Sequence, residues 1–178
     1  RDSSTSRGLG DVYKRQNESS RIYSTSNGGE SWDIVGSGPA TNIIKGVVYV
    51  SSDVGFFCYD YVEGMDSNLY KTDDGGKTFA KVMLEEQELD SSAANPQGQE
   101  TETKTDSGKN GADSSEQLRW GDVYKEALTP VVDSTGIITI YLTQGKNAVY
   151  NDGKTAAKYQ SSDKGSTWKY IGQVEIKD

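Results

Sequence analysis

Histidine is absent from all 178 residues of the sequence. Histidine is the usual general base of hydrolytic triads and the commonest side-chain ligand of metals such as zinc. Its absence excludes Ser-His-Asp and Cys-His catalysis, and His-ligated metal centres, from these residues. We expect no cofactor and no metal ion, and no residue of the chain is predicted to be catalytic.

Cysteine and proline are also scarce, at one and three residues. A single cysteine, Cys58, cannot form a disulfide within the chain, so cysteine usage does not assign a redox compartment. Its setting in Phe56-Phe57-Cys58-Tyr59 favours a small buried side chain over a nucleophile. Glycine is plentiful by contrast, at 20 residues, and many glycines with few prolines suit an all-β chain with many turns.

Two further features are missing from the sequence. No run approaches the roughly 18 apolar residues that span a bilayer, so we expect no transmembrane segment. An excess of basic residues is also missing, because 19 Lys and Arg face 27 Asp and Glu, for a net charge of −8. Nucleic-acid binding usually shows as a basic patch, so we expect no nucleic-acid partner.

What the sequence does contain is an eight-residue pattern in three copies, at Thr25–Trp32, Thr72–Phe79 and Ser161–Trp168. Each copy reads hydroxyl, any residue, Asp or Asn, any residue, Gly, any residue, hydroxyl, aromatic. The positions predicted to be structural site residues are Thr25, Asn27, Gly29, Trp32, Thr72, Asp74, Gly76, Phe79, Ser161, Asp163, Gly165 and Trp168.

The pattern predicts a hairpin connection between two antiparallel strands. A short Asp or Asn side chain accepts hydrogen bonds from backbone N–H groups further along the turn, and glycine supplies a backbone angle that a side chain would penalise. The hydroxyl groups tie the loop backbone, and the aromatic residue begins the next strand and packs between layers of sheet. These roles favour a structural function over ligand contact.

The three copies resemble the Asp-box, or BNR repeat, of sialidase-type β-propellers. The same box is found in sortilin-like receptors, some xyloglucan-degrading glycosidases and assembly-factor propellers. The third copy matches the S-x-D-x-G-x-T-W form at every fixed position, whereas the second departs at Thr72 and Phe79 and the first at Thr25, Asn27 and Ser31. The resemblance implies that the box lies on the propeller rim and is not catalytic.

Strand-like runs around the boxes predict an all-β fold, a partial β-propeller of about two and a half four-stranded antiparallel blades. Residues 17–84 hold half a blade and one full blade with two boxes, and residues 119–178 hold a blade with the third box. The clearest strand-like runs are at 43–51, 54–61 and 136–143, which are rich in β-branched and aromatic residues. Propellers close as rings of roughly 4–8 blades, so we interpret the chain as a fragment.

Two segments fall outside the predicted blades. Residues 1–16 end in Asp11–Gln16, which looks like a translated sequencing adapter, and we interpret them as a non-native leader that replaces the true N-terminus. Residues 85–118 carry nine acidic and two basic residues, a net charge of −7, and few apolar side chains. Such a composition cannot bury enough surface to order the chain, so we expect a disordered acidic insertion, with a cation-binding arm as the alternative.

Catalysis of the sialidase type would need an arginine cluster for the substrate carboxylate, a Tyr–Glu nucleophilic pair and an Asp acid/base. Outside residues 1–16 the only arginines are Arg21 and Arg119, which is too few. Calcium would favour clustered oxygens such as those of Asp73-Asp74 and Asp152-Gly153, but the ligand spacing of an EF-hand is absent and turn chemistry is the favoured interpretation.

Aromatic residues of the last blade offer a second kind of site, a face on which a sugar ring could stack. In a β fold such side chains usually form the core or the packing between blades, which is the interpretation that we favour. The residues are Trp120, Tyr141, Tyr150, Tyr159, Trp168 and Tyr170.

These observations lead to the hypothesis of a non-catalytic Asp-box propeller fragment that binds a carbohydrate or a protein partner. The resemblance, rather than any residue of the chain, implies a bacterial protein that is extracellular or in the cell envelope. The alternatives are a fragment of an exo-sialidase or other glycoside hydrolase, with its catalytic residues on missing blades, or an assembly-factor propeller.

Overall fold

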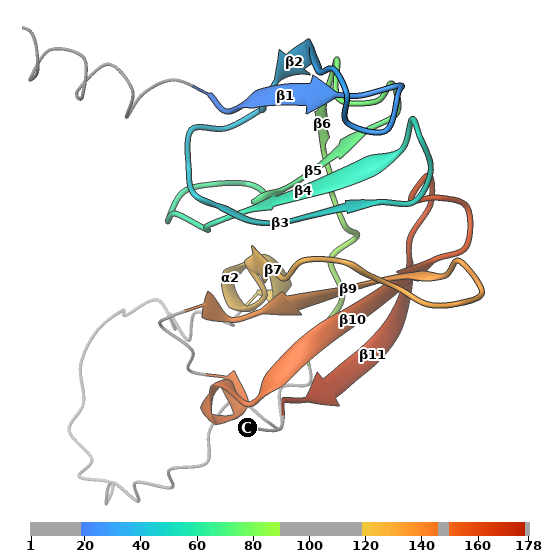
Figure 1. Ribbon diagram of the computed structural model, residues 1–178. Coiled ribbons are helices and arrows are strands. Elements are labelled where there is room, and N and C mark those ends of the chain that lie inside the picture. Colours follow the sequence, from blue (N-terminus) through green and yellow to red (C-terminus); the bar gives the residue numbers. More distant parts are fainter. Residues whose placement is uncertain (1–18, 90–118, 146–149, 177–178) are drawn as a thin grey trace, which may run out of the picture.

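The computed structural model describes residues 19–89, 119–145 and 150–176. These residues form three antiparallel sheets that lie one above another (Figure 1). The first sheet is a hairpin of β1 (Arg21–Ser24) and β2 (Asp33–Ser37). The prediction of an all-β fold is confirmed, and the sheets are arranged as a partial β-propeller.

The second sheet is a complete four-stranded blade in the order β3-β4-β5-β6. Its strands are β3 (Ile44–Tyr49), β4 (Gly55–Tyr59), β5 (Leu69–Thr72) and β6 (Ala80–Lys81). Consecutive strands are neighbours, so the sheet is an antiparallel meander. Every residue of β4 is buried, because other sheets cover both of its faces.

The third sheet follows the order β11-β10-β9-β7, and β8 also pairs with β9. Its strands are β7 (Glu126–Ala127), β8 (Val131–Val132), β9 (Ile138–Thr143), β10 (Thr155–Ser161) and β11 (Lys169–Glu175). Both β7 and β8 pair with β9, so together they form one interrupted first strand. The interruption contains Pro130, which has no N–H to give to a ladder.

Two single-turn helices accompany this sheet, α2 (Trp120–Val123) and the 3-10 helix η3 (Tyr150–Gly153). Neither is long enough to show a helical period in the sequence. Helix α2 carries Trp120 and Val123 into a cluster with Tyr124, Tyr150, Ala157 and Tyr159, beside the second sheet.

The main core lies between the second and third sheets. Phe56, Cys58 and Leu69 of the second sheet pack against Ile138 and Ile140 of β9. All five side chains are at most 1% exposed. Burial raises the pKa of the Cys58 thiol above its ordinary value, so at neutral pH this group is an uncharged, packed side chain rather than a reactive thiolate.

One polar side chain joins the two sheets. Asn68, which is 1% exposed, donates from Nδ2 to the carbonyl oxygens of Ala127 (3.0 Å) and Tyr59 (2.8 Å), and its Oδ1 accepts from the Ala127 N–H (2.8 Å). The amide therefore bonds to both backbone groups of one β7 residue, as a neighbouring strand would. This contact fixes the position of β7 against the start of β5.

The two segments that were predicted to lie outside the blades are only partly described. Residues 1–16 lie outside the described residues, as do residues 90–118 of the expected acidic insertion. Residues 85–89 are part of the fold, since Leu89 packs against the α2 cluster and the Tyr159 hydroxyl donates to the Glu85 carbonyl oxygen (2.6 Å). The first residues of the expected insertion are therefore packed against the third sheet, because Leu89 contacts the aromatic cluster and Glu85 accepts a hydrogen bond from Tyr159.

Replacing Asn68 with leucine tests the bond between the sheets. The variant N68L keeps the branched shape of the side chain, at a larger volume, but leaves the buried Ala127 N–H without its partner and the Ala127 carbonyl with only the weak Cys58 thiol donor, and we expect a loss of about 3 kcal/mol of unfolding free energy. Unfolding in urea, monitored by circular dichroism, measures this loss. The control Gln160→Ala, which removes one bond to the Thr139 hydroxyl, should cost only a few tenths of a kcal/mol. Equal losses in both variants would contradict a special role for Asn68.

Candidate functional site

The three eight-residue boxes all form hairpin turns. The first joins β1 to β2, the second β5 to β6 and the third β10 to β11. The three loops lie on the same side of the stacked sheets, to the right in Figure 1. The chain thus uses one type of turn for the last hairpin of each sheet.

The third box shows how the turn is held. The Ser161 hydroxyl donates to Asp163 Oδ1 (2.7 Å) and accepts from the Gly165 N–H (2.8 Å). Asp163 Oδ1 also accepts from the N–H groups of Ser166 (3.0 Å) and Thr167 (2.9 Å), and Oδ2 accepts from the Thr167 hydroxyl (2.6 Å). One carboxylate therefore binds four donors of its own loop.

The second box repeats this network at equivalent atoms. Thr72 donates to Asp74 Oδ1 (2.9 Å), which also accepts from the N–H groups of Lys77 (3.0 Å) and Thr78 (2.8 Å). The Thr78 hydroxyl donates to Oδ2 (2.6 Å), and the Gly76 N–H donates to the Thr72 hydroxyl (2.8 Å). Threonine replaces serine at the first position without changing the bonds.

The first box keeps the turn with an amide in place of the carboxylate. Asn27 Oδ1 accepts from the Thr25 hydroxyl (2.9 Å) and the Ser31 N–H (3.0 Å), and the Gly29 N–H donates to Thr25 Oγ1 (2.9 Å). The last bond reverses direction, because Asn27 Nδ2 donates to the Ser31 hydroxyl oxygen (2.9 Å). Asparagine therefore substitutes for aspartate with the loss of its charge and with one bond reversed.

Backbone conformation explains the glycine and reveals a constraint that the pattern had missed. The box glycines Gly29, Gly76 and Gly165 have φ of 98°, 96° and 77°. The residue before each of them is also left-handed, at φ of 73° for Gly28, 74° for Gly75 and 58° for Lys164. Glycine at this fourth position in two of the three copies was the available signal, since left-handed backbone favours glycine.

The aromatic residues of two boxes pack between sheets. Phe79 meets Phe57 edge-on, with ring centroids 4.9 Å apart, in the cluster that also holds Ile22 of β1. Trp168 meets Phe56 of the preceding sheet at 6.0 Å. Trp32 of the first box is 58% exposed. Trp168 thus joins the third sheet to the second, whereas Phe79 packs on Phe57 of its own sheet in a cluster that Ile22 of the first sheet also contacts.

Hydrogen bonds from their own loops depress the pKa values of the two box carboxylates. The pKa of Asp74 falls from 3.8 to about 2, mainly through the Thr78 hydroxyl and then the Thr78 N–H. Bonds from the equivalent Thr167 groups, and then from the Ser161 hydroxyl, hold the pKa of Asp163 below its ordinary range as well. Both carboxylates are charged at neutral pH and already engaged.

The hydrogen-bonding groups of the boxes are engaged within their own loops. No group of three or more metal-ligating side chains occurs within residues 19–89, 119–145 and 150–176. Asp73 forms an ion pair with Lys71 (2.6 Å), and Asp152 lies in the left-handed part of η3 with φ of 54°. Both of the dipeptides that invited a calcium interpretation, Asp73-Asp74 and Asp152-Gly153, lie in turns.

Neither the aromatic residues of the last blade nor the two arginines form the sites that were considered for them. Trp120, Tyr150 and Tyr159 are 3%, 1% and 1% exposed, so these rings form core rather than a sugar-stacking face. Arg21 is on β1 and Arg119 precedes α2, with the whole second sheet between them (Figure 1). No arginine cluster forms in the described part of the chain.

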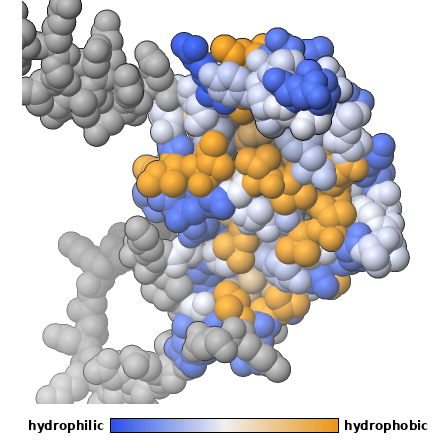
Figure 2. Space-filling view, in the orientation of Figure 1, coloured by the Kyte–Doolittle hydropathy of each residue, from blue (hydrophilic) through white to orange (hydrophobic). Residues whose placement is uncertain are grey.

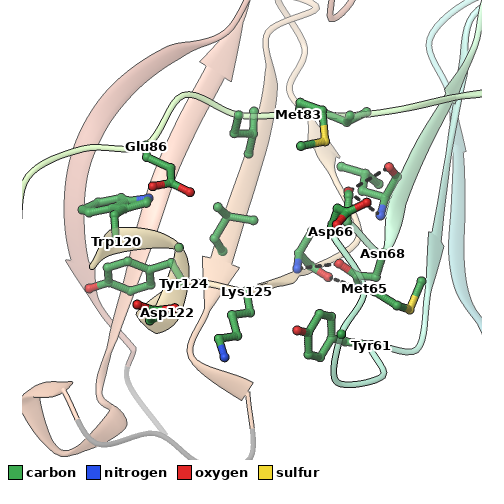
Figure 3. A pocket seen from close by; sticks show the side chains of 18 of the residues that line it. Tyr61, Met65, Asp66, Asn68, Met83, Glu86, Trp120, Asp122, Tyr124 and Lys125 are labelled. Carbon is green, nitrogen blue, oxygen red and sulfur yellow. Dashed lines mark hydrogen bonds between the residues drawn. The ribbon is translucent and has the colours of Figure 1, made fainter. Parts of the chain in front are cut away.

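A cleft between the second and third sheets is the strongest candidate for a binding site. Its volume is about 420 Å³. One wall is the loop before β5, with Tyr61, Met65 and Asp66, and the other is α2 with the strand that follows it (Figure 3). Because β5 begins at the cleft and ends at its box, the cleft and the boxes lie at opposite ends of the sheets.

The cleft carries more negative than positive charge. Its lining includes four carboxylates and one ammonium group, those of Glu63, Asp66, Glu86, Asp122 and Lys125. Lys125 Nζ pairs with Glu63 (3.1 Å), and Lys81 pairs with Asp66 (2.7 Å). The Glu86 carboxylate lies against Gly121, where any side chain would collide with it.

Tyr61 gives the cleft a hydrogen-bond donor beside an apolar ring face. Burial, and then the neighbouring Glu63 carboxylate, raises the pKa of its hydroxyl above the ordinary value. The group is therefore protonated at neutral pH. Sequence reasoning missed Tyr61 and the whole cleft, because its walls come from loops about 60 residues apart with no motif of their own.

Comparisons with known proteins give one structural similarity. No protein-family model matches the sequence. A search among curated proteins finds no match. Among solved structures, the chain is similar to a GH74 enzyme from Niastella koreensis, with 16% sequence identity and a TM-score of 0.43, over 84% of this chain and 18% of that one. The assignment of the fold rests on this chain's own sheets.

None of the helices within residues 19–89, 119–145 and 150–176 has the length and hydropathy needed to cross a bilayer.

Acid titration tests the box carboxylates. A depressed pKa in the folded state means that Asp74 stabilises the fold above pH ~4, where the unfolded carboxyl is ionised, and that this contribution is lost as the pH falls towards about 2. In the double variant D74N/D163N, the amide of asparagine takes the place of each carboxylate, as Asn27 does in the first box. We therefore expect a small cost at pH 7 and a flatter decline of unfolding free energy between pH 4 and 2.

The first box supplies the matched control. Asn27→Asp should add acid sensitivity in the same pH range, since it creates the bonds of the other two boxes. Chemical denaturation at several pH values measures both effects. A double variant that declines as steeply as the wild type would show that the box carboxylates do not determine acid stability.

Proposed function

We propose that this chain is a non-catalytic Asp-box β-propeller fragment of a secreted or envelope-associated bacterial protein, and that it binds a carbohydrate in the cleft between the second and third sheets. The observation that carries the proposal is the cleft itself. It combines an aromatic ring, that of Tyr61, with several hydrogen-bonding groups on both walls.

The size of the cleft favours a carbohydrate over a protein partner. Small-molecule sites typically measure about 300–1,000 Å³ and are concave, and the volume of about 420 Å³ lies within that range. Protein interfaces are broader, at roughly 800 Å² per partner. A carbohydrate of about one to three sugar rings therefore suits this space better than a protein partner does.

Charge then selects the kind of carbohydrate. The ammonium group of Lys125 is already paired with Glu63, which leaves no free cation for a sugar carboxylate within the lining residues that the structure describes. Glu86 provides acceptors for sugar hydroxyl groups, and Asp122 is paired with Arg119 (3.0 Å). The cleft thus favours neutral sugars and disfavours sialic or uronic acids, since its lining has more carboxylates than ammonium groups and like charges repel.

The match covers 18% of the GH74 enzyme's length, so the activity of any larger protein is a matter for proposal. The competing function is that of a glycoside hydrolase whose catalytic groups lie on other blades. The separation of Arg21 from Arg119 supports the non-catalytic proposal for the described residues.

Binding to a panel of immobilised neutral and sialylated glycans tests the proposal, followed by calorimetry on the best ligand. We expect binding to neutral glycans, and Tyr61→Ala should weaken it by about tenfold or more, because stacking and a hydroxyl donor are lost together. The neighbouring variant Val62→Ser removes an exposed apolar side chain outside the cleft and should leave affinity unchanged.

Two results would reject the proposal. One is selective binding of sialylated glycans, which the acidic cleft does not accommodate. The other is sustained hydrolysis of a fluorogenic glycoside by this chain, which would establish an enzyme.

A further inference from the structure

Three of the four carboxylates that line the cleft have a cation as partner. The pairs are Glu63 with Lys125 (3.1 Å), Asp66 with Lys81 (2.7 Å) and Asp122 with Arg119 (3.0 Å). The fourth carboxylate, that of Glu86, forms no ion pair and no hydrogen bond with another residue of the described ranges. The cleft therefore keeps one negative charge that no positive charge matches.

The Glu86 carboxylate lies on the wall of the cleft that α2 forms. Figure 3 shows it next to Trp120, and its Oε1 lies so close to Gly121 that a Cβ atom at that position would collide with it. The side chain is exposed, so its charge is hydrated when the cleft is empty. Water on a carboxylate can be exchanged for a charged donor of a ligand, which forms a stronger hydrogen bond than a neutral donor does.

Trp120 leaves a second polar group unused beside this carboxylate. The residue is 3% exposed, and its indole N–H has no hydrogen-bond partner in the part of the chain that the structure describes. The Tyr159 hydroxyl of the same aromatic cluster donates to the Glu85 carbonyl oxygen (2.6 Å) and forms no hydrogen bond with the indole. Figure 3 shows the indole nitrogen on the side of the ring that faces Glu86. A small shift of the exposed Glu86 side chain would bring this N–H into reach of a ligand oxygen.

The two groups call for different atoms of a ligand. A carboxylate only accepts hydrogen bonds and an indole N–H only donates. A protonated amine with a hydroxyl oxygen beside it satisfies both, and leaving the buried N–H unpaired costs free energy. An acetylated amine lacks the charge, and a carboxylate ligand has no donor for Glu86.

The surroundings favour an amine that is carried by a sugar ring. On the face that Figure 2 shows, hydrophobic and hydrophilic residues adjoin one another where the second and third sheets meet. The lining of the cleft is mixed in the same way, since Met65 and Leu142 contribute to it along with the charged residues. A sugar has apolar ring faces and polar edges, and it therefore fits such a surface better than a simple amine does.

We propose that the cleft prefers a carbohydrate with a free amino group, a 2-amino-2-deoxy sugar, and that Glu86 is the residue that selects it. The sugar ammonium group bonds to the Glu86 carboxylate, and a hydroxyl oxygen beside it accepts from the Trp120 N–H. One positive charge thus matches the one unpaired carboxylate. The inference rests on the proposed function, because it names the class of carbohydrate that the cleft binds most tightly.

A series of small probes that differ in one group tests this preference. The probes are methyl β-D-glucosaminide, methyl β-D-glucoside, methyl N-acetyl-β-D-glucosaminide and cyclohexylamine. Each is titrated into the 178-residue chain and followed by NMR, in which the indole N–H groups of Trp32, Trp120 and Trp168 give separate signals. We expect the glucosaminide to bind about tenfold or more tightly than the other probes and to shift the Trp120 signal.

Variants of the chain locate the selecting residue. Glu86→Gln removes the charge and should lower the affinity for the glucosaminide by about tenfold, to that for the glucoside. Gly121→Ala keeps the charge but places a methyl group where Glu86 Oε1 lies, so it should weaken glucosaminide binding as well. The control Glu175→Gln removes an exposed carboxylate of β11 outside the cleft and should leave the affinity unchanged. Circular dichroism confirms that the variants remain folded.

The outcomes separate this inference from the proposed function. Equal affinities for the glucosaminide and the glucoside, or a preference that survives Glu86→Gln, would overturn the inference and leave carbohydrate binding in place. Cyclohexylamine that binds as tightly as the glucosaminide would show that charge alone is recognised, and tighter binding of the acetylated sugar would assign the two groups to an amide; either result overturns the inference. Failure of all three sugars to bind would overturn the proposed function as well.

Discussion

The structure depends on one constraint, which is that each sheet must have its apolar face covered by the next sheet. A single antiparallel sheet of a few strands buries little surface and is marginal alone. Here β4 is buried on both faces because the first and third sheets lie on either side of it. The same requirement explains the aromatic residues that end the boxes, since Trp168 reaches Phe56 across the gap between sheets.

The boxes make this stacking repeatable. A loop that satisfies its own backbone donors with one side chain needs no help from neighbouring elements, so it keeps the same shape at different places in the fold. The change from Asp163 to Asn27 shows that geometry, more than charge, is retained, because the amide keeps the acceptor bonds from Thr25 and Ser31 and reverses the one to the Ser31 hydroxyl. Shape retention places the aromatic residue at the same point of each sheet.

Sequence reasoning succeeded where structure is local. The boxes, their hairpins and the strands beside them follow from residues that are close along the chain, and the break at Pro130 follows from its missing N–H. It could not find the bond between Asn68 and Ala127, because an isolated asparagine looks like a turn residue until the fold brings β7 beside it. The cleft was missed for the same reason, since Tyr61 and Trp120 come to line the same space only in three dimensions.

The two concave regions of the molecule differ in a way that separates their roles. The cleft is closed by described residues on both sides, and its polar groups are mostly paired, as at Lys125 and Glu63. The groove beside the first hairpin is lined instead by Ile22, Tyr23 and Trp32 and by residues of the second sheet, and its Tyr23 is 51% exposed where the equivalent Tyr159 is 1% exposed. A small ligand needs polar groups that fix its orientation within a concave site. The cleft has such groups on both walls, which is why the carbohydrate proposal rests on it rather than on the more apolar groove.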